Sequence, residues 1–160
     1  MSEPAVRRAT AEDADKLTVL ARAAYARHVP VIGREPMPMS ADWGQLLSEQ
    51  EIWILDGPAG EAVASLALDI QPDHVMIWSV AVAPAHQKRG LGRRLMALAE
   101  TRARALRRPE LRLFTNARME GNIALYRRLG YRETQREQLA ANRVLVHMSK
   151  AVAAGSDVST

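Results

Sequence analysis

The stretch that most constrains this chain runs from residue 75 to residue 104, where strand-like periodicity changes to helical periodicity across a pair of glycines. Residues 75–82 (VMIWSVAV) are apolar and rich in β-branched and aromatic side chains, which is typical of a buried strand. Pro84 ends this strand because proline lacks the N–H needed for a further ladder bond. Apolar residues then recur at helical spacing, so we expect a helix from about Gly90 to Leu106.

The turn between this strand and helix has the composition of an anion-binding site. The first N–H groups of a helix lack internal partners and carry partial positive charge, and glycines let a ligand approach the backbone closely. Lys88, Arg89, Arg93 and Arg94 add positive charge beside Gly90 and Gly92. A phosphate or pyrophosphate is therefore the expected ligand.

Two common phosphate-binding patterns do not fit this turn. Gly92 is followed by Arg93-Arg94 where a Walker A loop needs Lys-Ser/Thr, and a dinucleotide fingerprint fails at Leu95. The pattern Gln87-x-x-Gly90-x-Gly92 instead resembles the Gln/Arg-x-x-Gly-x-Gly/Ala loop of the GNAT N-acetyltransferase superfamily. The resemblance implies that this loop holds the pyrophosphate of acetyl-coenzyme A. An ordinary glycine turn leading into a basic surface helix is the alternative interpretation.

A second motif strengthens the resemblance. Asn122, Tyr126, Gly130 and Tyr131 are spaced like the Asn, Tyr and Gly-Phe/Tyr positions of the family's last helix. The resemblance implies that Tyr126 is the general acid for the leaving thiolate and that Asn122 contacts the pantetheine or phosphate arm. Taken alone, Tyr126 would more often be a packed helix aromatic. The coenzyme-binding residues implied by both motifs are Val80, Val82, Gln87, Lys88, Arg89, Gly90, Leu91, Gly92, Arg93, Asn116, Asn122 and Tyr126.

Acetyl transfer from a thioester to an amine needs a neutral amine, a donor that polarises the carbonyl oxygen, and a proton for sulfur. The backbone amide of Val80 or Val82 is our candidate for the carbonyl donor. Many family members carry a glutamate base on the strand before the loop, but residues 74–82 contain no carboxylate. The general base is therefore not identified from the sequence.

The acceptor site is expected on the irregular stretch between the first two helices, which by resemblance lies over the acceptor end of the coenzyme cleft. Its proline, methionine, tryptophan and charged residues suit a pocket with apolar walls and polar anchors, although a simple cap over the core explains the apolar ones equally well. The candidate acceptor-binding residues are Arg34, Glu35, Met37, Met39 and Trp43. Glu35, or less favourably Asp42, would pair with a cationic amine, and Arg34 would hold a carboxylate.

Periodicity predicts the remaining elements. Strands are expected at residues 5–9, 52–55, 62–70, 111–115, 131–134 and 144–148, and helices at 11–27, 40–48 and 122–129. We expect Pro30 to end the helical pattern of the first helix and Ser40 to cap the second. The fold class is α/β (α+β): a mixed, mostly antiparallel, twisted sheet flanked by about four helices, as the GNAT resemblance implies. Residues 1–150 form one domain, and residues 151–160 are expected to be a disordered tail.

Composition limits the remaining function classes. The 160 residues contain no cysteine and four scattered histidines, so a thiolate nucleophile and a metal site are not expected. The net charge is +4, but aromatics make up only 4%, which argues against nucleic-acid binding. No membrane span or signal peptide is recognised, so a cytoplasmic protein is expected; a homodimer is compatible with the sequence.

These observations predict an enzyme that transfers an acetyl group from acetyl-coenzyme A to a primary amine, by direct attack in a ternary complex and without a metal. The alternatives are a catalytically silent acyl-coenzyme A-binding or sensing module, and a protein or peptide N-acetyltransferase instead of one acting on a small molecule.

Overall fold

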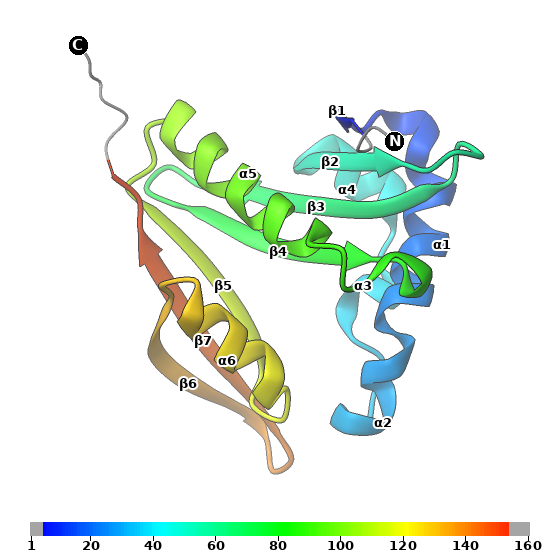
Figure 1. Ribbon diagram of the computed structural model, residues 1–160. Coiled ribbons are helices and arrows are strands. Elements are labelled where there is room, and N and C mark those ends of the chain that lie inside the picture. Colours follow the sequence, from blue (N-terminus) through cyan, green and yellow to red (C-terminus); the bar gives the residue numbers. More distant parts are fainter. Residues whose placement is uncertain (1–4, 154–160) are drawn as a thin grey trace.

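The computed structural model describes residues 5–153 and contains a seven-stranded sheet with the order β1-β2-β3-β4-β5-β7-β6 (Figure 1). The strands are β1 (Val6–Arg8), β2 (Glu51–Asp56), β3 (Ala62–Ile70), β4 (Val75–Val82), β5 (Glu110–Asn116), β6 (Arg132–Ala140) and β7 (Arg143–Ala151). Strands β4 and β5 run parallel, and the other adjacent pairs are antiparallel. The predicted mixed, mostly antiparallel sheet is confirmed.

Helices cover both faces of this sheet. They are α1 (Ala14–Tyr25), α2 (Val29–Ile32), α3 (Met37–Ser40), α4 (Trp43–Glu49), α5 (Leu91–Ala105) and α6 (Glu120–Arg128). Helices α5 and α6 lie on one face and α1 to α4 on the other (Figure 1). Because α2 and α3 are single turns, four longer helices remain, as predicted.

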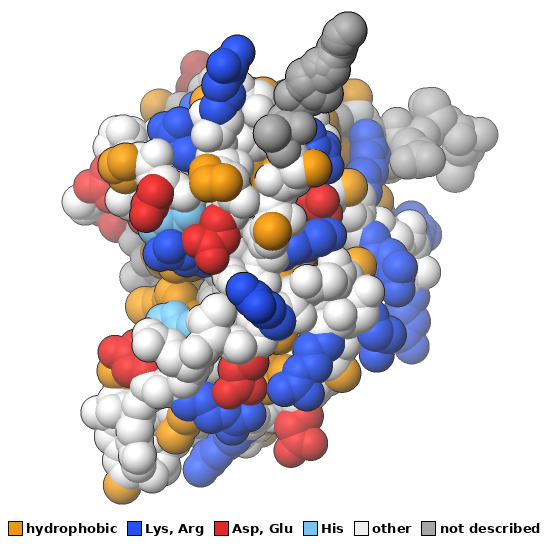
Figure 2. Space-filling view, turned by 90° about the vertical axis from the view of Figure 1, so that its left-hand side faces the viewer, with side chains coloured by type: hydrophobic (Ala, Val, Ile, Leu, Met, Phe, Trp, Pro, Cys, Tyr) orange, Lys and Arg blue, Asp and Glu red, His pale blue; other side chains and the backbone are white. Residues whose placement is uncertain are grey.

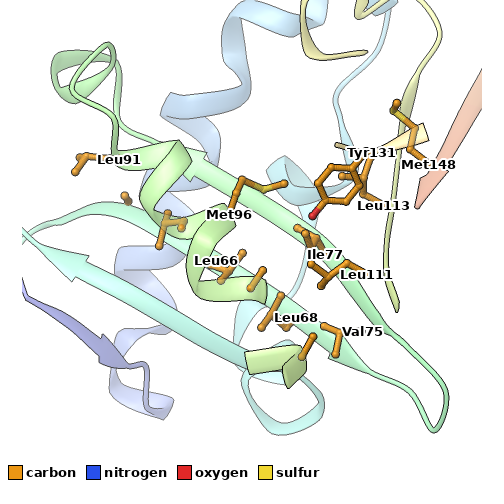
Figure 3. Close-up of a cluster of buried hydrophobic side chains, with 14 of the residues drawn as sticks. Leu66, Leu68, Val75, Ile77, Leu91, Met96, Leu111, Leu113, Tyr131 and Met148 are labelled. Carbon is orange, nitrogen blue, oxygen red and sulfur yellow. The ribbon is translucent and has the colours of Figure 1, made fainter. Parts of the chain in front are cut away.

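Each face has its own hydrophobic core. The α5-side core joins α5 and Ile123 of α6 to strands β3, β4, β5 and β7, and Figure 3 labels ten of its residues. The α1-side core packs Leu17, Leu20 and Trp43 against Ile52 and Ile54 of β2. The sheet is therefore buried on both faces over its central strands, which fixes the position of the strand ends.

The N-terminal helical region departs from the predicted pattern. The Thr10 N–H donates to Asp13 Oδ2 at 2.8 Å, so the chain enters the helix through a capping box. Pro30 does not end the helical pattern, because it occupies the first turn of α2, where a proline costs no internal hydrogen bond. The next cap is also different: Asp42, not Ser40, accepts a bond from the Gln45 N–H and starts α4.

The C-terminal part follows the prediction with longer strands. Gly130, at φ +100°, follows α6 in the left-handed conformation expected of a terminating glycine. The ordered chain extends past residue 150, because Ala151 ends β7 and Val152 is 7% exposed, with its N–H bonded to Pro109 O at 2.8 Å. The tail that we predicted from residue 151 therefore does not begin there, because residues 151 and 152 are ordered. Residues 154–160 lie outside the described part of the chain.

Strand β4 changes direction in its middle and then leaves β5. Ala67 pairs with Ser79 and Leu68 with Ile77, so Trp78 is an extra residue that forms a β-bulge opposite β3. On the other side, the β4–β5 ladder contains only the pairs of Val75 and Met76. Beyond them the two strands diverge (Figure 1), and this divergence opens the sheet.

Candidate functional site

The opening between β4 and β5 is a cavity of about 460 Å³. One wall is the second half of β4 with the loop leading into α5, and the opposite wall consists of the end of β5, α6 and the start of β7. The end of α1 and the connection from α2 to α3 close one end. Segments from across the sequence therefore meet at the point where the sheet splits.

Backbone groups of β4 point into this opening. The Ala83 N–H donates to Val63 O of β3 at 2.8 Å. Because successive peptide groups of a strand point to opposite sides, those of Val80 and Val82 point away from β3, toward the space that β5 has left. Two contacts agree with this direction: the Val80 carbonyl accepts from Tyr25 Oη at 3.0 Å, and the Val82 carbonyl accepts from Gln87 Nε2 at 3.1 Å.

The loop after β4 has the backbone geometry of an anion nest. Lys88 (φ +66°) and Gly90 (φ +78°) are both left-handed, and α5 begins at Leu91. A methyl group on Gly90 would meet no atom within 4 Å, and one on Gly92 would meet only Val82 Cγ2 at 4.0 Å. The space in front of both glycines is therefore open, and Lys88 and Arg93 also line the cavity.

Other loop residues have structural contacts. The Gln87 carboxamide accepts from Arg27 Nη1 as well as donating to Val82 O, so its side chain ties the loop to β4 and to the end of the first helical region. Leu91 is 8% exposed and belongs to the α5-side core. Arg89 lies beside His86, at 3.3 Å from its Nδ1, and does not line the cavity. Among the predicted loop residues, Arg89 is thus the one that the structure separates from the site.

Tyr126 lines the cavity from α6. Its ring packs edge-on against Tyr131, with 6.0 Å between ring centroids, and its hydroxyl has no hydrogen-bond partner within residues 5–153. Burial, followed by the nearby Tyr25, raises the pKa of Tyr126 above its usual value of 10. The phenol therefore keeps its proton at neutral pH and presents an uncommitted hydroxyl.

The predicted asparagines lie on the same side of the cavity as Tyr126. Asn122, on α6, and Asn116, at the end of β5, both line it. The Asn116 carboxamide oxygen accepts from the Arg118 N–H at 2.9 Å, which closes the turn after β5. Asn116 therefore shapes the site through its backbone turn, with Met119 beside it in the cavity wall.

The predicted acceptor residues divide into two groups. Arg34, Glu35 and Met37 line the cavity. Met39 and Trp43 do not, and this part of the prediction is corrected: they are 6% and 2% exposed. The Trp43 ring packs in the α1-side core and its Nε1 donates to Pro38 O at 3.1 Å, so the single turn of α3 directs these two side chains inward.

Three cavity residues were not predicted as functional. Tyr25, the last residue of α1, has its hydroxyl 3.0 Å from Ser79 Oγ and donates a hydrogen bond to Val80 O. His28 is half-buried, with its ring 5.9 Å from that of Tyr25, and burial and Arg27 lower its pKa below 6.5. Arg143 enters from the start of β7. Their sequence neighbourhoods carry no motif, and only long-range packing brings them together.

These features fit a coenzyme A-type ligand. The open space before two glycines and the left-handed loop suit a pyrophosphate, and the opening along β4 offers peptide groups to an amide-containing arm. Figure 2 shows Lys and Arg side chains most densely on its right-hand side. Arg102 and Arg104 of α5 form ion pairs with Glu51 and Glu100, so these two charges are compensated within the protein. Among the described residues, no group of His, Asp and Glu could hold a metal, and no helix could cross a membrane.

Comparison with known proteins agrees with this geometry. A family model described as acetyltransferase (GNAT) family matches residues 17–131. The ribosomal-protein-S18-alanine N-acetyltransferase of Escherichia coli is similar at a TM-score of 0.76 and 18% identity, over 98% of this chain and 99% of that one. PaiA N-acetyltransferase of Thermoplasma acidophilum, solved in complex with coenzyme A, is similar at a TM-score of 0.73 and 15% identity, over 94% of this chain and 99% of that one.

Nourseothricin acetyltransferase is similar at a TM-score of 0.71 and 17% identity, over 94% of this chain and 99% of that one. Identities this low establish a shared fold alone. The family match, by contrast, spans most of the chain and both predicted motifs. This chain therefore belongs to the GNAT family of acetyltransferases.

Proposed function

We propose that this protein transfers the acetyl group of acetyl-coenzyme A to a primary amine, with both substrates bound in one ternary complex. One observation carries the proposal: the Val80 and Val82 peptide groups, the Tyr126 hydroxyl and the glycine loop all face the same cavity. Together they supply what the reaction requires, namely a phosphate anchor, carbonyl polarisation and a proton donor.

Binding is assigned to the loop and α6. The N–H groups around Gly90 and Gly92 hold the pyrophosphate, helped by the positive charge of Lys88 and Arg93. Gln87 keeps the loop on β4, as its two hydrogen bonds indicate. Asn122 contacts the pantetheine arm from α6.

The coenzyme supplies an acetyl group activated as a thioester. The amine nitrogen attacks the carbonyl carbon, a C–N bond forms and the C–S bond breaks. The N–H of Val80 or Val82 stabilises the negative charge that develops on the carbonyl oxygen. Tyr126 donates its proton to the departing sulfur, a role that its retained proton and uncommitted hydroxyl support, and the proton that the nitrogen loses as the amide forms restores the Tyr126 hydroxyl.

The amine must be neutral when it attacks, and His28 is our candidate for the base. His28 lines the cavity, makes no hydrogen bond within the described chain, and has a lowered pKa, so its ring is neutral at pH 7. The other cavity bases are engaged: His86 lies beside Arg89, and Glu35 is 3.6 Å from Arg22.

Two alternatives remain open to test. A silent acyl-coenzyme A-binding module would bind the coenzyme without turnover. The acceptor could also be a protein amine, since one structural neighbour is named for ribosomal-protein-S18 alanine and another for nourseothricin. A cytoplasmic location, and the absence of a nucleic-acid or membrane partner, are part of the proposal.

The experiment is a panel of amino acids, polyamines, aminoglycosides and peptides, with thiol release from acetyl-coenzyme A as the readout. Acceptor-dependent thiol release is expected for at least one class. Tight coenzyme A binding without release from any acceptor would favour the silent module instead.

A further inference from the structure

Two arginines line the cavity without a partner among the described residues. Arg34 comes from the connection between α2 and α3, and Arg143 comes from the start of β7 on the opposite wall. Neither guanidinium has a hydrogen bond, ion pair or aromatic contact within residues 5–153. Arg143 is half-buried, and a cation withdrawn from water normally has a compensating partner.

A third guanidinium lies beside the segment that carries Arg34. A methyl group placed on Gly33 would lie 4.0 Å from Arg118 Nη1, so Arg118 reaches from the β5–α6 turn to the residue before Arg34. This approach brings the two walls of the cavity close together at their outer end. The Arg118 side chain also has no acidic partner in the described chain.

Negative charge is scarce at this end. Among the described residues that line the cavity, Glu35 is the one acidic side chain, and it forms an ion pair with Arg22. The remaining basic residues of the cavity have other positions: Arg27 bonds to Gln87, and Lys88 and Arg93 belong to the glycine loop. The acceptor end therefore keeps a surplus of positive charge that repels a purely cationic acceptor such as a polyamine.

Building on the proposed acetyl transfer, we infer that the acceptor is a small amine that also carries a carboxylate, held by Arg34 and Arg143. Guanidinium groups bind carboxylates through paired N–H···O bonds, and two of them on facing walls fix the direction of the amine. The size agrees, because the 460 Å³ cavity must also admit the thioester arm and leaves room for a small acceptor.

The test compares acceptors that differ only in the carboxylate. Each amino acid is assayed beside its carboxamide, and L-lysine and L-ornithine beside cadaverine and putrescine, which lack the carboxylate. We expect kcat/KM at least tenfold higher for the acids. In Arg143→Gln this preference should fall about tenfold, and in the more exposed Arg34→Gln about threefold, while coenzyme A affinity is unchanged.

Arg128→Gln is the matched control, because it removes the same charge from the exposed surface of α6 outside the cavity. It should leave the acid preference intact. Equal or better turnover of the amides and diamines would overturn the inference while leaving the acetyl transfer established. Equal losses of kcat/KM for acid and amide in Arg143→Gln would also overturn it. If none of the acceptors causes thiol release from acetyl-coenzyme A, the proposed function is overturned together with this inference.

Discussion

A substitution at Gly92 is expected to weaken coenzyme A binding without destabilising the fold, so it tests the two properties separately. Gly90 cannot serve, because its φ of +78° would strain any other residue by about 1–2 kcal/mol. Gly92 has an ordinary helical position in the first turn of α5, and an added Cβ meets only Val82 Cγ2, at 4.0 Å. Gly92→Leu therefore fits the free protein but fills the space where the pyrophosphate is expected.

The size of each effect follows from this geometry. Replacing a helical glycine stabilises the fold by up to about 1 kcal/mol. Loss of one or two hydrogen bonds to the charged pyrophosphate costs about 2–4 kcal/mol, which weakens coenzyme A binding by a factor of about 30 to about 1,000.

Calorimetric titration with coenzyme A and a thermal melt measure the two quantities on the same sample. Gly121→Leu is the matched control, since Gly121 is another helical glycine, has no atom within 4 Å of its Cβ position, and lies at an exposed position of α6 that does not line the cavity. Coenzyme A affinity that stays at the wild-type value in Gly92→Leu would refute the assignment of the loop.

Three further predictions follow from other parts of the site and fold. Tyr126→Phe keeps the packing but removes the proton donor, so kcat should fall on the order of 10²-fold with coenzyme A affinity intact; unchanged turnover would exclude Tyr126 as the acid. In wild type, kcat/KM should fall on acidification as His28 gains its proton, at a pH below the ordinary imidazole pKa because burial lowers the pKa of His28, and His28→Gln should lose this limb of the profile; an identical profile would exclude His28. Ending the chain after Lys150 should cost about 2 kcal/mol relative to ending it after Ala153, because it removes buried Val152; equal denaturant midpoints would contradict this.

The parts of the site that the sequence predicted depend on local backbone rules. Gly90 requires a positive φ, Pro84 ends a strand, and Gly130 terminates a helix. Each of these residues determines the backbone conformation only of its neighbours in sequence. The strand–loop–helix unit and the placement of Tyr126 on the last helix could therefore be predicted without knowing how the sheet was ordered.

The errors come from side chains whose direction depends on distant packing. Trp43 and Met39 lie in a segment whose apolar residues could face either the cavity or the core. The single turn of α3 directs both side chains into the core. Asp42 caps α4 and so cannot serve freely as an acceptor anchor. Arg143 reaches the cavity only because β7 inserts between β5 and β6, an order that periodicity does not reveal.

Strand β6 shows another limit. Its residues 132–140 are almost all exposed, with no alternation of apolar and polar side chains, so hydropathy gave only a short strand there. The full length of β6 follows from its pairing with β7, which is a long-range property.

The most direct test of the proposed function is to count products. Purified protein is incubated with acetyl-coenzyme A and an accepted amine, and the acetylated amine is quantified by mass spectrometry beside the released thiol. Direct transfer predicts equal amounts of the two, formed only when both substrates are present, with the rate reduced in Tyr126→Phe. Thiol release without acetylated amine, or coenzyme binding without either product, would contradict the proposal that this cavity transfers acetyl groups to amines.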